Sequence, residues 1–236
     1  RRYQDAEEGV YRAALRDSVE GVGGSIKDVG PEGLSQAYDA TDAAYRDALG
    51  GRQFNGRDPQ FLDEMGAAIQ AGEQIPELGP QFSHAIRKDI KPLFDADGML
   101  TGERLQDSLQ FLRNRRASYG QHPLGSDIGE AFLGVEDAIK GMAGRQIPEV
   151  VPKLDAANAA YRKVNVLADA AKTAVNRGGN PTPAQINRAS VNSTNKFLGK
   201  RAAVTGGRPF AQLGDDAERI IPSKVGDSGT ASRVAA

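Results

Sequence analysis

Residues 128–142 read IGEAFLGVEDAIKGM, and the spacing of the large apolar residues in this stretch decides the fold class. These residues follow one another at steps of four, three, four and three: Ile128, Phe132, Val135, Ile139 and Met142. Because an α-helix has about 3.6 residues per turn, such steps place all five side chains on one helix face. The stretch therefore predicts an amphipathic helix that packs its apolar face against other helices.

A second helical pattern lies between Pro148 and Gly178. Its heptad seam, with steps of three and four residues, consists of Leu154, Ala157, Tyr161, Val164, Ala168, Ala171 and Val175. We expect one long Ala-rich helix over 147–177, because Pro is tolerated in a first helical turn and Gly commonly ends a helix. The small residues of the seam predict a helix–helix interface with close approach.

The remaining chain follows the same helical pattern. Leu105, Leu109 and Leu112 predict a further amphipathic helix between Thr101 and Tyr119. Sustained two-residue alternation, the pattern of a half-buried strand, is absent from the sequence. We therefore expect an all-α fold, an array or bundle of amphipathic helices without a sheet core, followed by an irregular Gly/Ser-rich C-terminal tail.

An internal similarity suggests two related helical units. Residues 39–46, DATDAAYR, return 116 positions later as DAANAAYR at 155–162, and Pro-Glu precedes each copy. A chance likeness between Ala-rich helices is the alternative explanation. We expect an N-terminal helical unit at 1–92, a central helical unit at 93–178, and a basic helix-turn segment with the tail at 179–236.

The composition excludes several kinds of site. The 236 residues include no Cys, which excludes disulfides, thiolate metal sites and cysteine nucleophiles. His84 and His122 are the only histidines, and their spacing is not that of zinc ligands on a helix. We expect no metal, no cofactor and no small-molecule substrate. Because the chain begins at Arg1 without a visible signal peptide, we also expect a piece of a longer polypeptide.

The near-neutral total charge conceals a basic segment. Residues 1–169 carry 20 Lys/Arg and 27 Asp/Glu, whereas residues 170–214 carry seven Lys/Arg and no acid. The seven cations are Lys172, Arg177, Arg188, Lys196, Lys200, Arg201 and Arg208. Contacts from these side chains to phosphates would give salt-sensitive, sequence-independent DNA binding, and a solvated linker is the alternative. Phe197 and Phe210 are too few for a base-stacking platform.

The stretch 226–230, GDSGT, resembles the surroundings of the nucleophile in chymotrypsin-like serine proteases. Such a nucleophile needs a histidine base, a group that orients the base, and oxyanion donors on a rigid scaffold. Here the motif lies close to the terminus in a Gly/Ser/Thr-rich tail of a helical chain. We interpret it as a polar turn and expect no catalytic residue. This C-terminal turn segment consists of Asp227, Ser228, Gly229, Thr230 and Arg233.

Another short motif, Asp95-Ala-Asp97-Gly98, has the residue types of a calcium loop. An EF-hand requires ligands at fixed loop positions and Gly at the sixth, whereas Gly98 falls at the fourth position counted from Asp95. The motif therefore predicts a turn ahead of the helix that begins near Thr101. Carboxylates at helical spacing in 1–169 are similarly typical of a solvated helix face rather than of paired catalytic acids.

Four blocks that occur in order resemble the C-terminal part of a virion family. They are 94–106 (FDADGMLTGERLQ), 135–139 (VEDAI), 182–185 (TPAQ) and 213–233, with the tail motif at its end. Together they resemble internal virion proteins of short-tailed bacteriophages, the DNA-ejection or DNA-transfer proteins, over roughly residues 75–236. The resemblance implies a largely helical chain that is stored in the capsid and helps to make a path for the genome through the host envelope.

From the resemblance we expect a structural virion protein rather than an enzyme. It implies a location in the capsid interior or portal–tail region, and then in the host envelope or periplasm on infection. The implied partners are copies of the chain itself and portal, tail or other ejection proteins, with phage DNA and the host envelope as further contacts. Two alternatives stay open: a sequence-independent DNA-binding virion module that uses 170–214, and an envelope-degrading enzyme.

Overall fold

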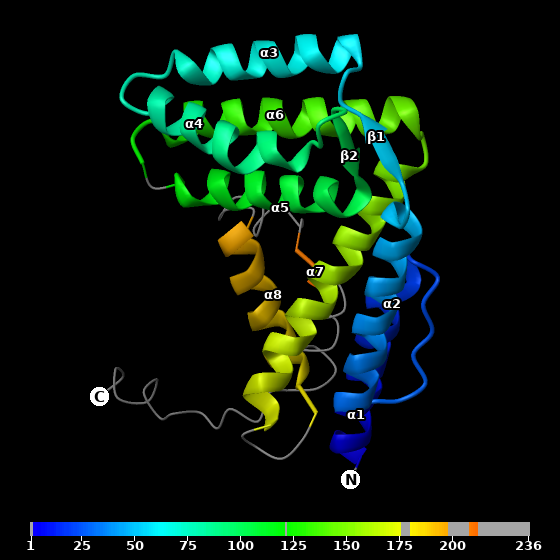
Figure 1. Ribbon diagram of the computed structural model, residues 1–236. Coiled ribbons are helices and arrows are strands. Elements are labelled where there is room, and N and C mark those ends of the chain that lie inside the picture. The colour runs from blue at the N-terminus through cyan, green and yellow to red at the C-terminus, as the bar shows by residue number, and fades with distance from the viewer. Residues whose placement is uncertain (1, 121, 176–179, 198–207, 212–236) are drawn as a thin grey trace, which may run out of the picture. The chain divides into compact units, whose positions relative to one another are not determined.

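The computed structural model describes residues 2–120, 122–175, 180–197 and 208–211. These residues are mostly helical and contain one small two-stranded sheet, which confirms the all-α fold (Figure 1). The C-terminal turn segment, 227–233, lies outside the described residues. The α-helices are α1 (Arg2–Glu20), α2 (Pro31–Leu49), α3 (Pro59–Glu73), α4 (Gly79–Ala85), α5 (Gly102–Ser118), α6 (Gly125–Gln146), α7 (Val150–Val175) and α8 (Pro183–Phe197).

The chain forms two compact units that are not consecutive in sequence. Unit 1 consists of Arg1–Asp42 and Ala157–Ala236, and unit 2 consists of Ala43–Ala156. This division differs from the expected boundaries after residues 92 and 178. The physical reason is that α2 and α7 each contribute to both units, so the N-terminal and C-terminal parts of the chain build unit 1 together.

The internal similarity falls at the junctions between the units. Its first copy, 39–46, lies in α2 and spans the boundary after Asp42, and its second copy, 155–162, lies in α7 and spans the boundary before Ala157. Each copy therefore contributes residues to both units. The two compact units do not correspond to the two copies.

Helix α6 is central to unit 2, where it packs against α3 and α5. The five apolar residues predicted for its face, Ile128, Phe132, Val135, Ile139 and Met142, are each at most 1% exposed. The helix predicted between Thr101 and Tyr119 is α5. Thr101 is its N-cap, with the Thr101 hydroxyl accepting a hydrogen bond from the Arg104 backbone N–H at 3.4 Å. Both sequence predictions are confirmed.

A two-stranded antiparallel sheet in unit 2 was not expected from the sequence. It joins β1 (Gln53–Asn55) to β2 (Met99–Thr101), and Phe54 pairs with Leu100. Both of these side chains are fully buried. Strands of three residues are too short to show an alternating pattern, and their pairing joins distant parts of the chain. Only the packing of Phe54 and Leu100 into the core reveals them.

Helix α4 continues into a π-helical turn, η1 (Ile86–Ile90), and a 3-10 turn, η2 (Lys91–Leu93). The cause is Pro92, whose nitrogen has no hydrogen to donate to the carbonyl of Lys88 four residues earlier. The backbone N–H of Lys91 donates to the carbonyl of Ile86, five residues back, where a regular α-helix would use the carbonyl of Arg87. Arg87 and Lys88 are exposed on this wider turn, and such turns are frequent at functional sites.

The long helix predicted over 147–177 is α7, which spans Val150–Val175. Of the predicted seam, Leu154, Ala157 and Val164 are buried, but Tyr161 is 40% exposed. Ala168 and Ala171 are half-buried, and the side chain of Val175 lies outside the described residues. The seam prediction therefore places the buried face of the C-terminal half of α7 incorrectly.

The buried face of this half of α7 is rotated by one residue from the predicted seam. Its members are Ala160, Val164, Leu167, Ala170 and Ala174, and Val166 beside Leu167 is also buried. The rotation brings Leu167 into the core of unit 1 instead of Ala168, and the larger side chain buries more apolar area. Tyr161 packs edge-on against Tyr38 of α2, with 6.1 Å between ring centroids.

Candidate functional site

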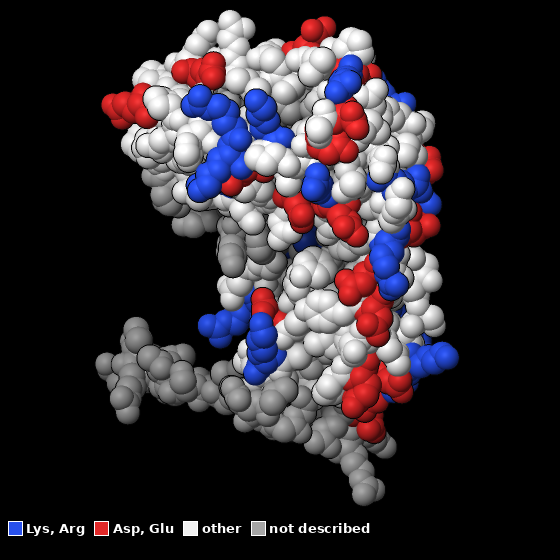
Figure 2. Space-filling model, viewed as in Figure 1, with Lys and Arg blue, Asp and Glu red and all other residues white. Residues whose placement is uncertain are grey.

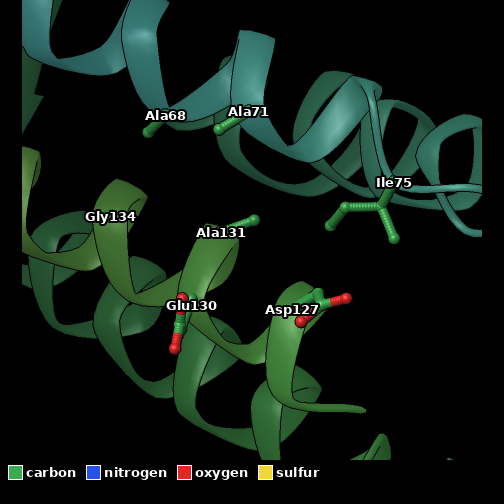
Figure 3. Close-up of a pocket in the computed structure, with 7 residues that line it drawn as sticks. All are labelled: Ala68, Ala71, Ile75, Asp127, Glu130, Ala131 and Gly134. Carbon is green, nitrogen blue, oxygen red and sulfur yellow. The ribbon is translucent and has the colours of Figure 1, made fainter. Parts of the chain in front are cut away.

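A shallow groove of about 330 Å³ lies between α3 and α6 in unit 2 (Figure 3). Ala68 and Ala71 point from α3 toward α6, and Ile75 closes one end. On the other wall, Gly134 allows close approach: a Cβ atom there would lie 3.2 Å from the Cβ of Ala68. The small residues of both helices thus create the groove by letting the two backbones come together.

Two carboxylates accompany the apolar lining of the groove. Asp127 and Glu130 are exposed residues of α6, and the Glu130 side chain points away from α3 (Figure 3). Asp127 lies in the first turn of α6, where a negative charge is favourable. The lining contains no histidine, serine or lysine that could act as a base or nucleophile. Chemically, the groove can accommodate an apolar group next to a cation.

A buried carboxylate gathers three cations between α5 and α6. Glu136 Oε1 accepts hydrogen bonds from Arg113 Nε at 3.1 Å and Lys140 Nζ at 3.0 Å, and Arg116 Nη1 lies 3.6 Å from Oε2. Burial by itself would raise the pKa of Glu136, but the hydrogen bonds and charges of Lys140 and Arg113 outweigh it and hold the pKa below its ordinary value. The cluster therefore keeps Glu136 charged and carries a net positive charge.

A second ionic clamp joins α6 to the start of α3. Arg145 Nη1 lies 3.0 Å from Glu64 Oε1, and Arg145 Nη2 lies 3.1 Å from Asp58 Oδ1. The same Asp58 oxygen caps α3 by accepting a hydrogen bond from the backbone N–H of Phe61 at 2.7 Å. The hydrogen bonds that Arg145 donates to the Glu64 carboxylate are the main reason that the pKa of Arg145 is raised. Both clamps hold helices to one another.

Unit 2 also presents a basic surface that was not predicted from the sequence. Its members, which we name the η1–α5 basic surface, are Arg87, Lys88, Lys91, Arg104 and Arg115, and all five are exposed. Lys and Arg side chains gather over α4, η1 and the end of α5 (Figure 2). The charge sum over 1–169 is negative and conceals this group, although the cluster of Arg87, Lys88 and Lys91 within five residues was a local signal for it.

The cations predicted to bind DNA lie in unit 1 and are only partly described. Lys172 is exposed and lies 3.1 Å from Asp169, so an acid neutralises it. Arg188 is exposed, and Arg208 donates a hydrogen bond to Asn187 Oδ1 at 3.0 Å. Arg177, Lys200 and Arg201 and the side chain of Lys196 lie outside the described residues. DNA binding by these seven cations therefore stays a prediction.

The calcium-like motif forms the turn that its spacing predicted. Asp95 Oδ1 accepts hydrogen bonds from the backbone N–H groups of Asp97 at 2.9 Å and Met99 at 2.8 Å. Gly98 has a φ of +76°, which a residue with a side chain adopts only at a cost. The Asp95 carboxylate is therefore used to shape the backbone ahead of β2.

The described residues contain no group of three His, Asp or Glu side chains that could hold a metal ion. His84 and His122 are both exposed, and His122 Nδ1 accepts a hydrogen bond from the backbone N–H of Leu124 at 3.1 Å. Within the described ranges, no helix is both long enough and apolar enough to cross a membrane. Comparisons with protein-family models, with curated proteins and with solved structures each gave no match.

Proposed function

We propose that the chain is a structural component of a bacteriophage particle, an internal virion protein that enters the host together with the genome. The proposal rests on the four sequence blocks between residues 94 and 233 and on the all-helical fold. In it, the chain acts by assembly rather than by catalysis. Its partners are copies of itself and the portal, tail or other ejection proteins of the same particle.

The structural observation that carries the proposal is that charged side chains in unit 2 connect helices to one another. Glu136 and Arg145 each bridge two or more elements, and the contacts that they make are between helices rather than around a cavity. Ionic clamps of this kind fix how helices pack and so favour one arrangement over others. A protein that assembles with several partners in a particle requires such a fixed arrangement, because each partner contacts a surface formed by particular helices.

The fold also supports delivery through a narrow passage. In unit 2, α3 packs on α4 and α5 packs on α6, which are neighbours in sequence, and α6 also packs on the more distant α3. Contacts that are local in sequence form quickly, because little loop entropy is lost when they close. In the proposal, these local helix pairs form first when the chain refolds after it has passed through a channel in an extended form.

Quantitative mass spectrometry of purified particles tests the proposal. Peptides of this chain are expected in intact particles, protected from added protease, and depleted in particles that have released their genome. Peptides of the major capsid protein serve as the internal control and should stay constant. Absence of the chain from intact particles, or equal amounts before and after genome release, would contradict the proposal.

The envelope-degrading alternative is tested separately. The purified chain is incubated with isolated cell walls, and the turbidity of the suspension is followed with lysozyme as the positive control. We expect no clearing. Clearing that persists in the Ser228→Ala variant would assign an activity to another residue, and clearing that is lost in that variant would assign it to the C-terminal turn segment.

A further inference from the structure

We propose that the η1–α5 basic surface of unit 2 binds the phosphodiester backbone of nucleic acid without reading its sequence. This inference does not depend on the proposed role in a virion. It places nucleic-acid binding in unit 2, which lies within the net-acidic part of the sequence (1–169), and not in the basic segment at 170–214. Four observations carry it: the surface has an excess of positive charge, contacts within the protein orient its cations, the cations extend along α5, and, in the described ranges, no large apolar residue is exposed among them.

The five cations share η1, η2 and α5 with three acids, Asp89, Glu103 and Asp107, so the surface keeps an excess of positive charge. Among the described residues, Asp89 is the carboxylate that contacts it, with 3.7 Å from Asp89 Oδ2 to Arg115 Nη2. Arg87 Nε donates instead to the Ser83 carbonyl at 3.3 Å, and Arg104 Nη1 donates to the Leu93 carbonyl at 3.1 Å. These carbonyl contacts orient the guanidinium groups and leave their charge available.

The cations are held in place before any ligand arrives. Pro92 and the π-helical turn fix the backbone that carries Arg87, Lys88 and Lys91. Arg115 lies over the ring of Phe111, 5.2 Å from its centroid. An Arg side chain that is already oriented loses less conformational entropy when it binds a phosphate.

The surface is long enough to follow a nucleic-acid strand. Arg104 and Arg115 are eleven residues apart on α5, which corresponds to about 16 Å at roughly 1.5 Å per residue. This length matches about five nucleotides at roughly 3.4 Å per nucleotide along a duplex. Lys88 and Lys91 lie on the neighbouring η1 and η2, to which α5 is joined by the Arg115–Asp89 and Arg104–Leu93 contacts.

The same surface lacks the features of a protein interface. The large apolar residues that are exposed in the described ranges are Leu62, Leu133 and Tyr161, and none belongs to η1, η2 or α5. Stable protein interfaces have an apolar or aromatic centre that supplies most of the affinity. Phosphate contacts need only well-placed cations, and they carry no sequence information. The chemistry therefore favours a nucleic-acid backbone.

The proposal is tested by fluorescence anisotropy with a fluorescein-labelled DNA duplex of mixed sequence. The surface variant replaces Arg87, Lys88 and Lys91 by Ala, and a matched variant replaces the exposed residues Arg16, Lys27 and Arg162 by Ala, so each loses three positive charges. At about 50 mM salt we expect the surface variant to bind on the order of tenfold more weakly. We expect its log–log salt slope to fall by about 0.9 for each phosphate that the variant no longer neutralises.

The matched variant is expected to bind DNA like the unchanged chain, and Lys88→Arg with Lys91→Arg is expected to preserve binding because the charge is kept. Circular dichroism checks that each variant is folded. The proposal is overturned if the unchanged chain does not bind at about 50 mM salt, or if the matched variant loses affinity while the surface variant does not. Tighter binding at the same salt to polyglutamate or to phosphatidylserine vesicles would also overturn it, in favour of an acidic protein or a membrane surface.

Discussion

Arg113 Nε donates a hydrogen bond to the Glu136 carboxylate at 3.1 Å and so joins α5 to α6. The Glu136 side chain is only 4% exposed, whereas that of Arg113 is 35% exposed. The carboxylate therefore depends on protein cations for solvation, and the cations are partly solvated by water. Because Glu136 is the more buried partner, we expect a substitution of Glu136 to change the stability of unit 2 more than a substitution of Arg113.

Glu136→Gln should destabilise unit 2 by about 1–3 kcal/mol. The substitution keeps the shape of the side chain but leaves Arg113, Arg116 and Lys140 without the charge that holds them together. The loss should be smaller than the roughly 3–5 kcal/mol of fully buried pairs, because these cations reach solvent. Urea unfolding measures it, and Glu130→Gln on the exposed side of α6 is the control, with a change within about 0.5 kcal/mol. An equal effect of both substitutions would show that the clamp contributes nothing.

The same clamp predicts a dependence of stability on acid. Because the folded state lowers the pKa of Glu136 below 4.5, its contribution is complete above that pH and is lost as the pH falls through the folded-state value. The pKa of Asp47 is also lowered, by a hydrogen bond from Lys153, so the informative quantity is the difference between the unchanged chain and Glu136→Gln. That difference should shrink below pH 4.5. A difference that stays constant down to full protonation would contradict the assignment.

Two glycines of α3 should respond to alanine in opposite directions. At Gly72 a Cβ atom would lie 2.2 Å from Cε1 of the buried Phe82, so Gly72→Ala must displace that ring and should cost about 1–3 kcal/mol. At Gly66 no atom lies within 4 Å of an added Cβ. Gly66→Ala should therefore stabilise the helix by about 0.5–1 kcal/mol through the lower entropy of the unfolded chain. Thermal unfolding measures both, and a stabilising Gly72→Ala would disprove the α3–α4 packing.

Tyr11→Phe should stabilise unit 1 by about 1 kcal/mol at neutral pH. Tyr11 is 1% exposed, and within the described part of the chain its hydroxyl has no hydrogen-bond partner, so removing the hydroxyl relieves the cost of burying it. Burial also raises the pKa of Tyr11 to about 12. The folded state therefore favours the neutral phenol over the phenolate. This preference acts fully below pH 10, the ordinary pKa, and the stability that depends on it is lost as the pH rises toward 12.

Chemical denaturation at pH 7 and above pH 10 separates the two effects of Tyr11. The variant should lose less stability than the unchanged chain in the alkaline range. Destabilisation by Tyr11→Phe at neutral pH would show that the hydroxyl has a partner. Burial also raises the pKa of Tyr38, so the informative quantity is the difference between the unchanged chain and Tyr11→Phe.

The sequence by itself determined the helices, because the signals that specify a helix lie within a few residues of one another. The four-and-three spacing from Ile128 to Met142 predicted α6, and Thr101 predicted the start of α5. The turn at Asp95 likewise depends only on a side chain and the backbone beside it. Each of these features is stabilised by local hydrogen bonds or by one helix face, and tertiary packing then adds to a preference that already exists.

Only the tertiary structure decided which helices share a core and which face of α7 is buried. The seam through Tyr161 and the buried face through Leu167 are neighbouring stripes of one helix, and the choice between them depends on what packs against it. The pairing of Phe54 with Leu100, and the contact of Asp89 with Arg115, join segments that lie far apart in the chain. Such contacts form because they increase the apolar area that the whole unit buries. That area depends on residues distant in the chain, so a short stretch of sequence does not predict it.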